Sequence, residues 1–291
     1  MEAALTREDP IITGYREHCA TLARGDTPYR IIAEMMSRAT GSTKGKGGSM
    51  HYYNRKNNFY GGHGIVGAQV SLGTGLAFTL KYTNKPNAAF AMFGDGAVPQ
   101  GQVYESSNIA ALWKLPVVYV IENNHFGMGT PEARSNFYHP LHAKFRGIPG
   151  LNAQGNDVFS VREASRFSKN FAIQNGPLFL EFDTYRYVGH SMSDPGISYR
   201  TKDEVNAYKE SKDVIDKIKN YILGFKVANE NDLKSIEREI KDRLAQDLEK
   251  IKNDPYPEAK ELYTEVYVED AEAPYIRATE YSNSVFREHK Q

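Results

Sequence analysis

The sequence is poor in several features that would assign a protein class at once. A single cysteine, Cys19, occurs in 291 residues, which excludes an internal disulfide and a cysteine-built metal cluster and suits a reducing compartment. No apolar run approaches the roughly 20 residues that a membrane helix requires. Lys plus Arg and Asp plus Glu number 36 each, so the zero net charge gives no reason to expect a nucleic-acid-binding or membrane-binding surface.

The first residues, MEAALTREDP, also lack a targeting pattern, having neither an apolar signal-peptide core nor an Arg-rich, acid-poor composition. What is present is an ordinary globular composition, with 40% hydrophobic and 25% charged residues. Most glycines and apolar runs lie in residues 1–200, which predict an α/β domain. Residues 201–291 are highly charged and predict a helical extension followed by an extended tail, which packs on the same domain or on a partner subunit.

Short apolar runs alternate with helical segments between residues 67 and 182. Buried strands are expected at 88–93, 117–121 and 178–182. Helices are expected at 67–81, 100–115 and 161–175. The alternation predicts an α/β fold, with a mostly parallel sheet covered by helices on both faces. Glycines within 67–81 cost helix stability and are best explained by close packing of that helix against another backbone.

Two other segments have a recognisable local pattern. Apolar residues recur every three or four positions from Leu233 to Ile251, which predicts an amphipathic helix packed along one stripe, with Asp232 as its N-cap. Gly41 to Ser49, GSTKGKGGS, predicts a loop. Composition favours a flexible connector there, and a loop that closely approaches an anionic ligand is the alternative.

Polar residues follow two of the expected strands. Gly94-Asp95-Gly96 ends the first strand and Asn123-Asn124 ends the second, so both reach the carboxyl edge of a parallel sheet, where ligands bind. A helix that begins near Pro99 would direct its free N–H groups to the same place. The oxygens of Asp95 and Asn124 are hard ligands, suited to Mg²⁺ or Ca²⁺. Either segment alone is common as a turn or a cap, but together they predict a metal-bridged diphosphate site.

The stretch GDGAVPQGQVYESSNIAALWKLPVVYVIENN resembles the thiamine diphosphate motif, which opens with Gly-Asp-Gly and closes with Asn-Asn. The flanking segments KGKGGSMHYYNRKNNFYGGHGIVGAQV, FGMGT and TYRYVGHSMSDPGISYRT are more specific. They are similar to the alpha subunits of the pyruvate dehydrogenase decarboxylating component, within the thiamine diphosphate-dependent 2-oxo acid dehydrogenase family. The similarity extends from about Gly14 to the tail, and the pyruvate branch fits better than the branched-chain branch.

The resemblance implies roles for particular residues. Those assigned to thiamine diphosphate are Tyr15, Arg16, Gly64, Val66, Asp95, Gly96, Ala97, Asn124 and Arg186. Mg²⁺ would be bound by the side chains of Asp95 and Asn124 and by the backbone carbonyl of Phe126. The two arginines would hold the diphosphate as permanently charged, bidentate donors. Gly64 and Val66 would contact the aminopyrimidine through backbone groups, and Gly96 and Ala97 would meet the diphosphate.

His190 is the catalytic residue that the resemblance implies, facing the reacting carbon to donate a proton or to orient the acyl acceptor. His18 and His63 are weaker candidates near cofactor motifs. Ser191 and Ser198 match the family's regulatory phosphorylation serines, which implies a kinase and a phosphatase. A third such position holds Pro131 and cannot be phosphorylated.

The implied activity is Mg²⁺- and thiamine diphosphate-dependent decarboxylation of pyruvate with reductive acetylation of a lipoyl group, toward acetyl-CoA. The implied partners are a beta subunit, in an assembly of two alpha and two beta chains, and a lipoyl-bearing acetyltransferase component. The mitochondrial matrix is the implied location.

Other interpretations stay open. Only fourteen residues precede Tyr15, fewer than in the family's alpha subunits, which would suit a shortened, non-catalytic paralogue that acts in assembly or regulation. A branched-chain 2-oxo acid dehydrogenase alpha subunit is another alternative. A nucleotide-binding protein ranks last, because the sequence has no Walker lysine motif and no dinucleotide glycine fingerprint after a strand.

Overall fold

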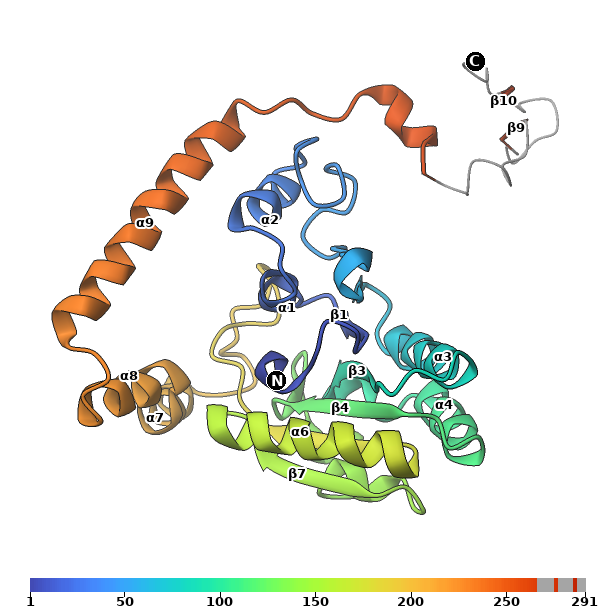
Figure 1. Ribbon diagram of the computed structural model, residues 1–291. Helices are drawn as coiled ribbons and strands as arrows, with labels where there is room; N and C mark the ends of the chain where they lie inside the picture. The colour runs from blue at the N-terminus through green and yellow to red at the C-terminus, as the bar shows by residue number, and fades with distance from the viewer. Residues whose placement is uncertain (266–274, 277–284, 287–291) are drawn as a thin grey trace. The chain divides into compact units, whose positions relative to one another are not determined.

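The computed structural model describes residues 1–265, 275–276 and 285–286. It divides the chain into two compact units, residues 1–255 and 256–291. In the second unit the described elements are η5 (Ala259–Tyr263) and two short antiparallel strands, β9 (Tyr275–Ile276) and β10 (Val285–Phe286). Most of the predicted extended tail therefore lies outside the described residues. The elements of the first unit are shown in Figure 1.

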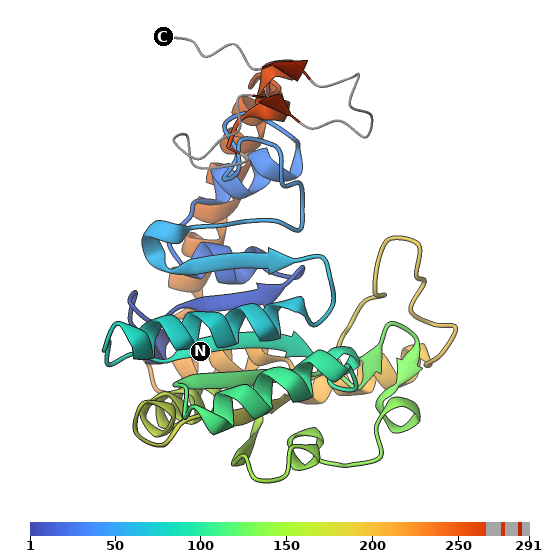
Figure 2. The ribbon, with the colours of Figure 1, turned by 90° about the vertical axis from the view of Figure 1, so that its right-hand side faces the viewer.

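Six strands form the central sheet of the first unit, in the order β2-β1-β3-β4-β8-β7. They are β1 (Ile11–Gly14), β2 (Phe59–His63), β3 (Ala89–Gly94), β4 (Val117–Asn123), β7 (Gly150–Gln154) and β8 (Leu178–Asp183). All neighbouring pairs are parallel. The carboxyl ends therefore meet at one edge, toward the right in Figure 2. The predicted parallel α/β sheet is confirmed.

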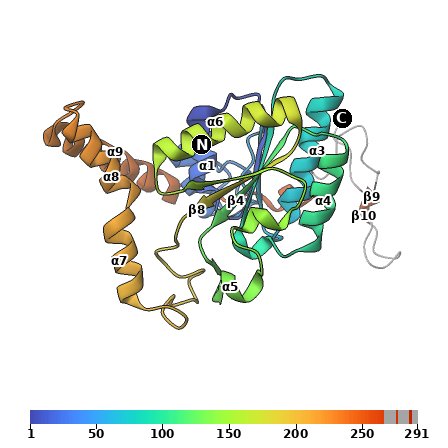
Figure 3. The same ribbon diagram turned by 90° about the horizontal axis from the view of Figure 1, so that it is seen from below.

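Helices cover both faces of the sheet. On one face lie α3 (Ala68–Tyr82) and α4 (Gly101–Leu112), and on the other α6 (Val158–Asn175) and α1 (His18–Ala23) (Figure 3). Side chains alternate along a strand, so Tyr119 packs with the first helix pair while Val118 and Val120 pack with α6. Strands β3, β4 and β8 are mostly apolar because helices bury both of their faces.

The remaining elements of the first unit are mostly short. They are α2 (Pro28–Met35), the hairpin strands β5 (Phe126–Gly127) and β6 (Thr130–Pro131), α5 (Glu132–Ser135), α7 (Lys202–Lys212), α8 (Val214–Gly224), α9 (Glu230–Lys252), and the 3-10 turns η1 (Glu2–Ala4), η2 (Arg55–Asn57), η3 (Asp95–Ala97) and η4 (Leu141–Lys144). No helix in the part of the chain that the structure describes is long and apolar enough to cross a membrane.

The expected strands at 88–93, 117–121 and 178–182 are present as β3, β4 and β8. Helix α4 differs from its prediction at both ends. It begins one residue later, at Gly101, because the extended backbone of Gln100 makes that residue the N-cap. It ends at Leu112, and two residues later Lys114 adopts a left-handed conformation, with φ of 48°. Strands β1, β2 and β7 were not predicted.

Helix α9 forms where the apolar repeat predicts it, but its cap and packing differ. The N-cap is Asn229, whose side chain accepts the backbone N–H groups of Asn231 and Asp232, so Asp232 completes a capping box and is not the cap itself. Only Ile251 is buried, near α2, whereas Ile236 and Ile240 are 52% and 53% exposed. The prediction that the whole stripe is packed is therefore wrong for the isolated chain.

Two glycines of α3 have opposite surroundings. A Cβ atom at Gly73 would lie 2.5 Å from the Cβ of Ala91, whereas one at Gly75 would meet nothing within 4 Å. Gly73 therefore lets the helix approach β3 closely, as predicted, but Gly75 lies on the exposed face.

We expect these two positions to respond oppositely to alanine. Gly73→Ala should lower the free energy of unfolding by about 1–3 kcal/mol, because the added methyl overpacks the contact with Ala91. Gly75→Ala should raise it by about 1 kcal/mol, because alanine is the better helix former and no clash arises. Urea unfolding of the two variants measures both effects, and equal shifts would contradict the described packing.

A buried carboxyl group supports the segment that leads into α1. Glu17 is fully buried and accepts the backbone N–H of Tyr52 at 2.9 Å, while its Oε2 atom has no partner. A side chain at Gly62 would collide with it. Burial raises the pKa of Glu17 to about 8, against the opposing effect of the Tyr52 N–H.

The raised pKa of Glu17 predicts a stability that falls as pH rises. Between the ordinary glutamate pKa and about 8, the unfolded chain loses a proton that the folded chain keeps. Glu17→Gln should match the wild type near pH 5 and exceed its stability near pH 9 by at least about 1.4 kcal/mol, the free energy of one pKa unit. Urea unfolding at the two pH values provides the test, and a pH-independent difference would refute it.

Candidate active site

The Gly-Asp-Gly and Asn-Asn segments meet at the carboxyl edge of the sheet. Gly94 pairs in register with Glu122, so η3 and the residues after β4 leave the sheet side by side. A Cβ atom on either Gly96 or Gly127 would lie 3.1 Å from the Cα of the other. This backbone-to-backbone approach, which glycine permits at both positions, seats the β5–β6 hairpin on the Gly-Asp-Gly turn.

Buried oxygen atoms without hydrogen-bond partners lie at this meeting point. Asp95 is 1% exposed, and neither of its carboxylate oxygens has a hydrogen-bond partner; the Oδ1 atom of Asn124 is likewise buried and unpartnered. Burial raises the pKa of Asp95, although the backbone N–H groups of Asn124 and Asp95 favour its ionised form without completing a hydrogen bond. Buried polar atoms are rarely left unpaired, so these three oxygens are available to bind a cation.

The donor set fits a hard divalent cation. Within residues 1–265 and the two short strands beyond them, no group of three or more His, Cys, Asp or Glu side chains could hold a metal. A cation at Asp95 would therefore be bound by one carboxylate together with neutral oxygens. That combination suits Mg²⁺, which takes one or two carboxylates and completes its shell with phosphate and water oxygens.

The two asparagines after β4 have different functions. Asn123 accepts the backbone N–H of His125 at 3.1 Å and donates to Glu181 at 3.0 Å, which shapes the turn and ties it to β8. Both its oxygen and its nitrogen are therefore engaged inside the protein. Asn124 alone is left with a free oxygen, as the predicted role requires.

His125 is a residue that sequence reasoning missed. Its Nδ1 atom lies 2.8 Å from Glu132 and its Nε2 atom 2.7 Å from Asp183. The hydrogen bond to Glu132, followed by that to Asp183, raises the pKa of the ring against the effect of burial. The backbone is left-handed here, with φ of 67°. His125 thus fastens the start of the hairpin to α5 and to the end of β8, between Asn124 and Phe126.

Arg186 contacts the protein more than the resemblance suggested. Its guanidinium, mostly buried, donates to the carbonyls of Phe126 at 3.1 Å and Met128 at 2.6 Å, to Val188, and to the hydroxyl of Tyr199 at 2.7 Å. Two residues predicted to hold different parts of the cofactor are therefore in direct contact. Four of the five donor positions of Arg186 are used, and the Phe126 carbonyl keeps one lone pair.

Tyr15, Arg16 and His190 come together across 174 positions of sequence. Arg16 donates to the Nδ1 atom of His190 at 3.1 Å and to its carbonyl at 3.0 Å, and the Tyr15 ring lies edge-on to the imidazole at 5.9 Å. Because a guanidinium only donates, Nδ1 must accept, and the proton of the ring is on Nε2. Burial, then the charges of Arg16 and Arg186, lower the pKa of His190.

The loop after His190 is held by Asp194. This carboxylate accepts the backbone N–H groups of His190 at 2.7 Å and Gly196 at 2.8 Å, and the Tyr199 hydroxyl at 2.6 Å. The hydrogen bond from Tyr199 is the main cause of its lowered pKa. Ser191 and Ser198, the expected phosphorylation positions, are both exposed.

Gly64 and Val66 lie in the connection between β2 and α3. The carbonyl of Val66 accepts a hydrogen bond from Gln102 of α4 at 3.3 Å, and a side chain at Gly67 would crowd Gln100 and Gln102. The connection thus rests on the first turn of α4, close to Asp95, Gly96 and Ala97 in the chain. The predicted aminopyrimidine contacts, Gly64 and Val66, therefore lie next to the start of the helix that follows the Gly-Asp-Gly turn.

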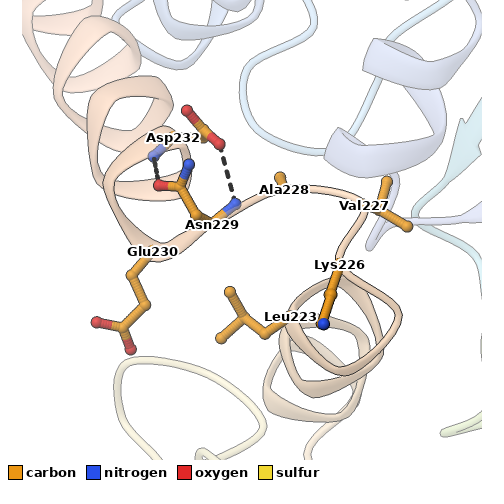
Figure 4. Close-up of a pocket in the computed structure, with 7 residues that line it drawn as sticks. All are labelled: Leu223, Lys226, Val227, Ala228, Asn229, Glu230 and Asp232. Carbon is orange, nitrogen blue, oxygen red and sulfur yellow. Dashed lines mark hydrogen bonds between the residues drawn. The ribbon is translucent and has the colours of Figure 1, made fainter.

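A separate hollow of about 460 Å³ lies where α8 meets α9 (Figure 4). Leu223 and Val227 line it with charged and polar residues of the α9 capping box. None of the site residues predicted from the sequence lines it, and Asp95 and Asn124, with their unpartnered oxygens, are not part of its lining. The sheet edge is therefore the better candidate.

Comparison with known proteins agrees with this geometry. The family described as Dehydrogenase E1 component matches residues 1–260. "Pyruvate dehydrogenase E1 component subunit alpha-1, mitochondrial" of Oryza sativa subsp. japonica is 51% identical over 92% of this chain and 69% of its own.

Two relatives from distant organisms give the same result. The mitochondrial subunit alpha of Dictyostelium discoideum is 48% identical over 98% of this chain and 74% of its own. "Pyruvate dehydrogenase E1 component subunit alpha" of Rickettsia bellii is 50% identical over 90% and 81%. Together with the parallel sheet, these matches show that the chain belongs to the dehydrogenase E1 component family.

Proposed function

We propose that this chain is the alpha subunit of a pyruvate dehydrogenase E1 component. It would decarboxylate pyruvate with thiamine diphosphate and Mg²⁺ and acetylate a lipoyl group, toward acetyl-CoA. The observation that carries the proposal is the set of buried, unpartnered oxygens on Asp95 and Asn124. The contact between Arg16 and His190 supports it. Relatives named as pyruvate dehydrogenase E1 alpha subunits, at about half identity over most of the chain, support the choice of substrate.

Mg²⁺ would be held by the side-chain oxygens of Asp95 and Asn124 and the remaining lone pair of the Phe126 carbonyl. The diphosphate would meet the backbone of Gly96 and Ala97, with Tyr15, Arg16 and the one unused donor of Arg186 nearby. Gly64 and Val66 would offer backbone groups to the aminopyrimidine. When bound, thiamine diphosphate supplies the electron sink that decarboxylation of a 2-oxo acid requires.

His190 would position the reacting groups through a hydrogen bond. The contact from Arg16 fixes the ring orientation and leaves Nε2–H as the available donor. The lowered pKa keeps the ring neutral at physiological pH. A neutral donor can hold a substrate oxygen without adding a third positive charge beside Arg16 and Arg186.

Partners follow from the same assignment. A beta subunit would complete the site in an assembly of two alpha and two beta chains, and a lipoyl-bearing acetyltransferase component would accept the acetyl group. The cofactor role is assigned to the domain at residues 1–200. Partner contact is assigned to the extension at 201–291, where Ile236 and Ile240 are exposed. The names of most relatives support the mitochondrial matrix as location.

Regulation by a kinase and a phosphatase belongs to the same proposal. Ser191 and Ser198 are exposed, and Ser191 lies three residues from the Asp194 carboxylate that holds the loop of His190. A phosphate on Ser191 would add about −1.5 to −2 charges beside that carboxylate. Repulsion would loosen the loop and obstruct the lipoyl group.

The proposed activity is tested by co-expressing the chain with the beta subunit of its own organism. The complex should release carbon dioxide from pyruvate in the presence of Mg²⁺ and thiamine diphosphate, and the chain alone should not. Faster turnover of branched-chain 2-oxo acids would assign it to that branch. A folded complex that binds no thiamine diphosphate would favour the non-catalytic paralogue.

Asp95→Ala tests the metal site within that complex. We expect Mg²⁺-dependent binding of thiamine diphosphate to fall by at least about 100-fold, because the only charged oxygen of the site is lost. The free energy of unfolding should stay equal or rise, since an unpartnered buried carboxylate is removed. Titration calorimetry and urea unfolding measure the two effects. Unchanged cofactor affinity would reject the assignment of Asp95.

A further inference from the structure

The glycine-rich loop at Gly41–Ser49 surrounds a carboxylate of the chain itself. Glu34, on α2, is fully buried. Its Oε2 atom accepts the backbone N–H groups of Thr43 at 2.9 Å and Gly45 at 2.8 Å, and its Oε1 atom accepts those of Gly47 at 2.7 Å and Gly48 at 3.2 Å. Four donors on one carboxylate form a closed cradle, of the kind that backbone N–H groups make for anions.

The glycines are required by this cradle. Gly45 and Gly48 have φ of 74° and 63°, in the region that favours glycine. A side chain at Gly41 would collide with the Glu34 carboxylate. The preferred interpretation from the sequence, a flexible connector, is therefore wrong. The loop is tied down and is no flexible connector, and the anion in its cradle is internal.

The loop also contacts two histidines, His18 and His51, through Thr43, Gly47 and Ser49. The Thr43 hydroxyl donates to the carbonyl of His51 at 3.3 Å, and a side chain at Gly47 would collide with the same carbonyl. The Ser49 hydroxyl lies 3.1 Å from the Nε2 atom of His18. The fold of the loop around Glu34 thus sets the positions of Ser49 and His51.

His51 has a defined tautomer and faces a predicted cofactor contact. Its Nδ1 atom lies 3.1 Å from the carbonyl of Gly62. A carbonyl only accepts, so Nδ1 carries the proton and Nε2 of the neutral ring is an acceptor. A Cβ atom at Gly64 would lie 3.5 Å and 3.6 Å from the Cε1 and Nε2 atoms of His51, which places the acceptor edge of the ring against Gly64.

We propose that Glu34 is a positioning residue, which orders the 43–48 loop and thereby holds the Nε2 acceptor of His51 at the Gly64 edge of the cofactor site. The acceptor is suited to the amino group of an aminopyrimidine, which the backbone of Gly64 and Val66 would also contact. This inference rests on the proposed function, because it assigns a further binding residue to the same cofactor. It adds a histidine and a buried glutamate to which the sequence assigned no role.

Substitutions of Glu34 and His51, made in the complex with the beta subunit, distinguish the roles of the two residues. Glu34→Gln places an amide nitrogen among backbone donors, so loop order should be lost. His51→Asn keeps a donor near the Nδ1 position for the Gly62 carbonyl but removes the distal acceptor. Glu8→Gln, at an exposed glutamate, is the matched control.

Two measurements are needed, neither of which depends on turnover. Amide hydrogen exchange of residues 43–51 reports loop order without cofactor, and titration calorimetry reports thiamine diphosphate affinity with Mg²⁺. Glu34→Gln should speed exchange and weaken binding by about 10–100-fold, the range for residues that orient ligand-contacting groups. His51→Asn should weaken binding by at least about 10-fold with exchange unchanged. Glu8→Gln should change neither.

The contrary outcomes are distinct. Wild-type affinity in both variants, with a wild-type complex that binds the cofactor, overturns this inference alone. Faster exchange in Glu34→Gln without weaker binding reduces Glu34 to a structural residue and also overturns it. A wild-type complex that does not bind thiamine diphosphate rejects the proposed function instead. If Glu34→Gln does not fold, His51→Asn still decides whether the acceptor matters.

Discussion

A buried carboxylate without a partner is the constraint on which the site depends. A desolvated carboxylate without a hydrogen-bond partner, such as that of Asp95, costs at least a few kcal/mol. Several other contacts in the fold hold Asp95 in this position. The glycine contact between Gly96 and Gly127 holds the hairpin over it, and Asn123 and His125 fix the turn that brings Asn124 beside it. The unfavourable burial of Asp95 is tolerated because the parallel sheet, which is packed on both faces, is stable enough to hold its carboxyl edge in place.

The sequence predicted the parts of the fold that have strong periodicity. The runs at β3, β4 and β8 are apolar throughout, so their burial and parallel pairing could be inferred, and with them the edge that carries Asp95 and Asn124. Strands β1 and β2 could not, because one is four residues long and the other contains two glycines. The α9 cap was misplaced by three residues because both Asn229 and Asp232 belong to the capping box.

Side-chain partners separated in sequence were beyond prediction. Nothing in the pattern of Gly41–Ser49 shows that its anion is supplied by Glu34 from the preceding helix. The sequence predicted a diphosphate contact for Arg186, but its use of four donors on the hairpin, Val188 and Tyr199 depends on the three-dimensional path of the loop. Residue type and spacing thus predicted which segments meet at the sheet edge, whereas the contacts of each side chain could be read only from the structure.

The contact between Arg16 and His190 has a consequence for biosynthesis. The two residues are 174 positions apart, and the strand that carries His190 to the edge, β8, is the last to be translated of the six. A growing chain can therefore assemble β1 to β4 while the imidazole is still inside the ribosome. During that interval the Asp95 turn can form before the loop of His190 is present, and premature termination before β8 would leave β4 as an exposed edge strand.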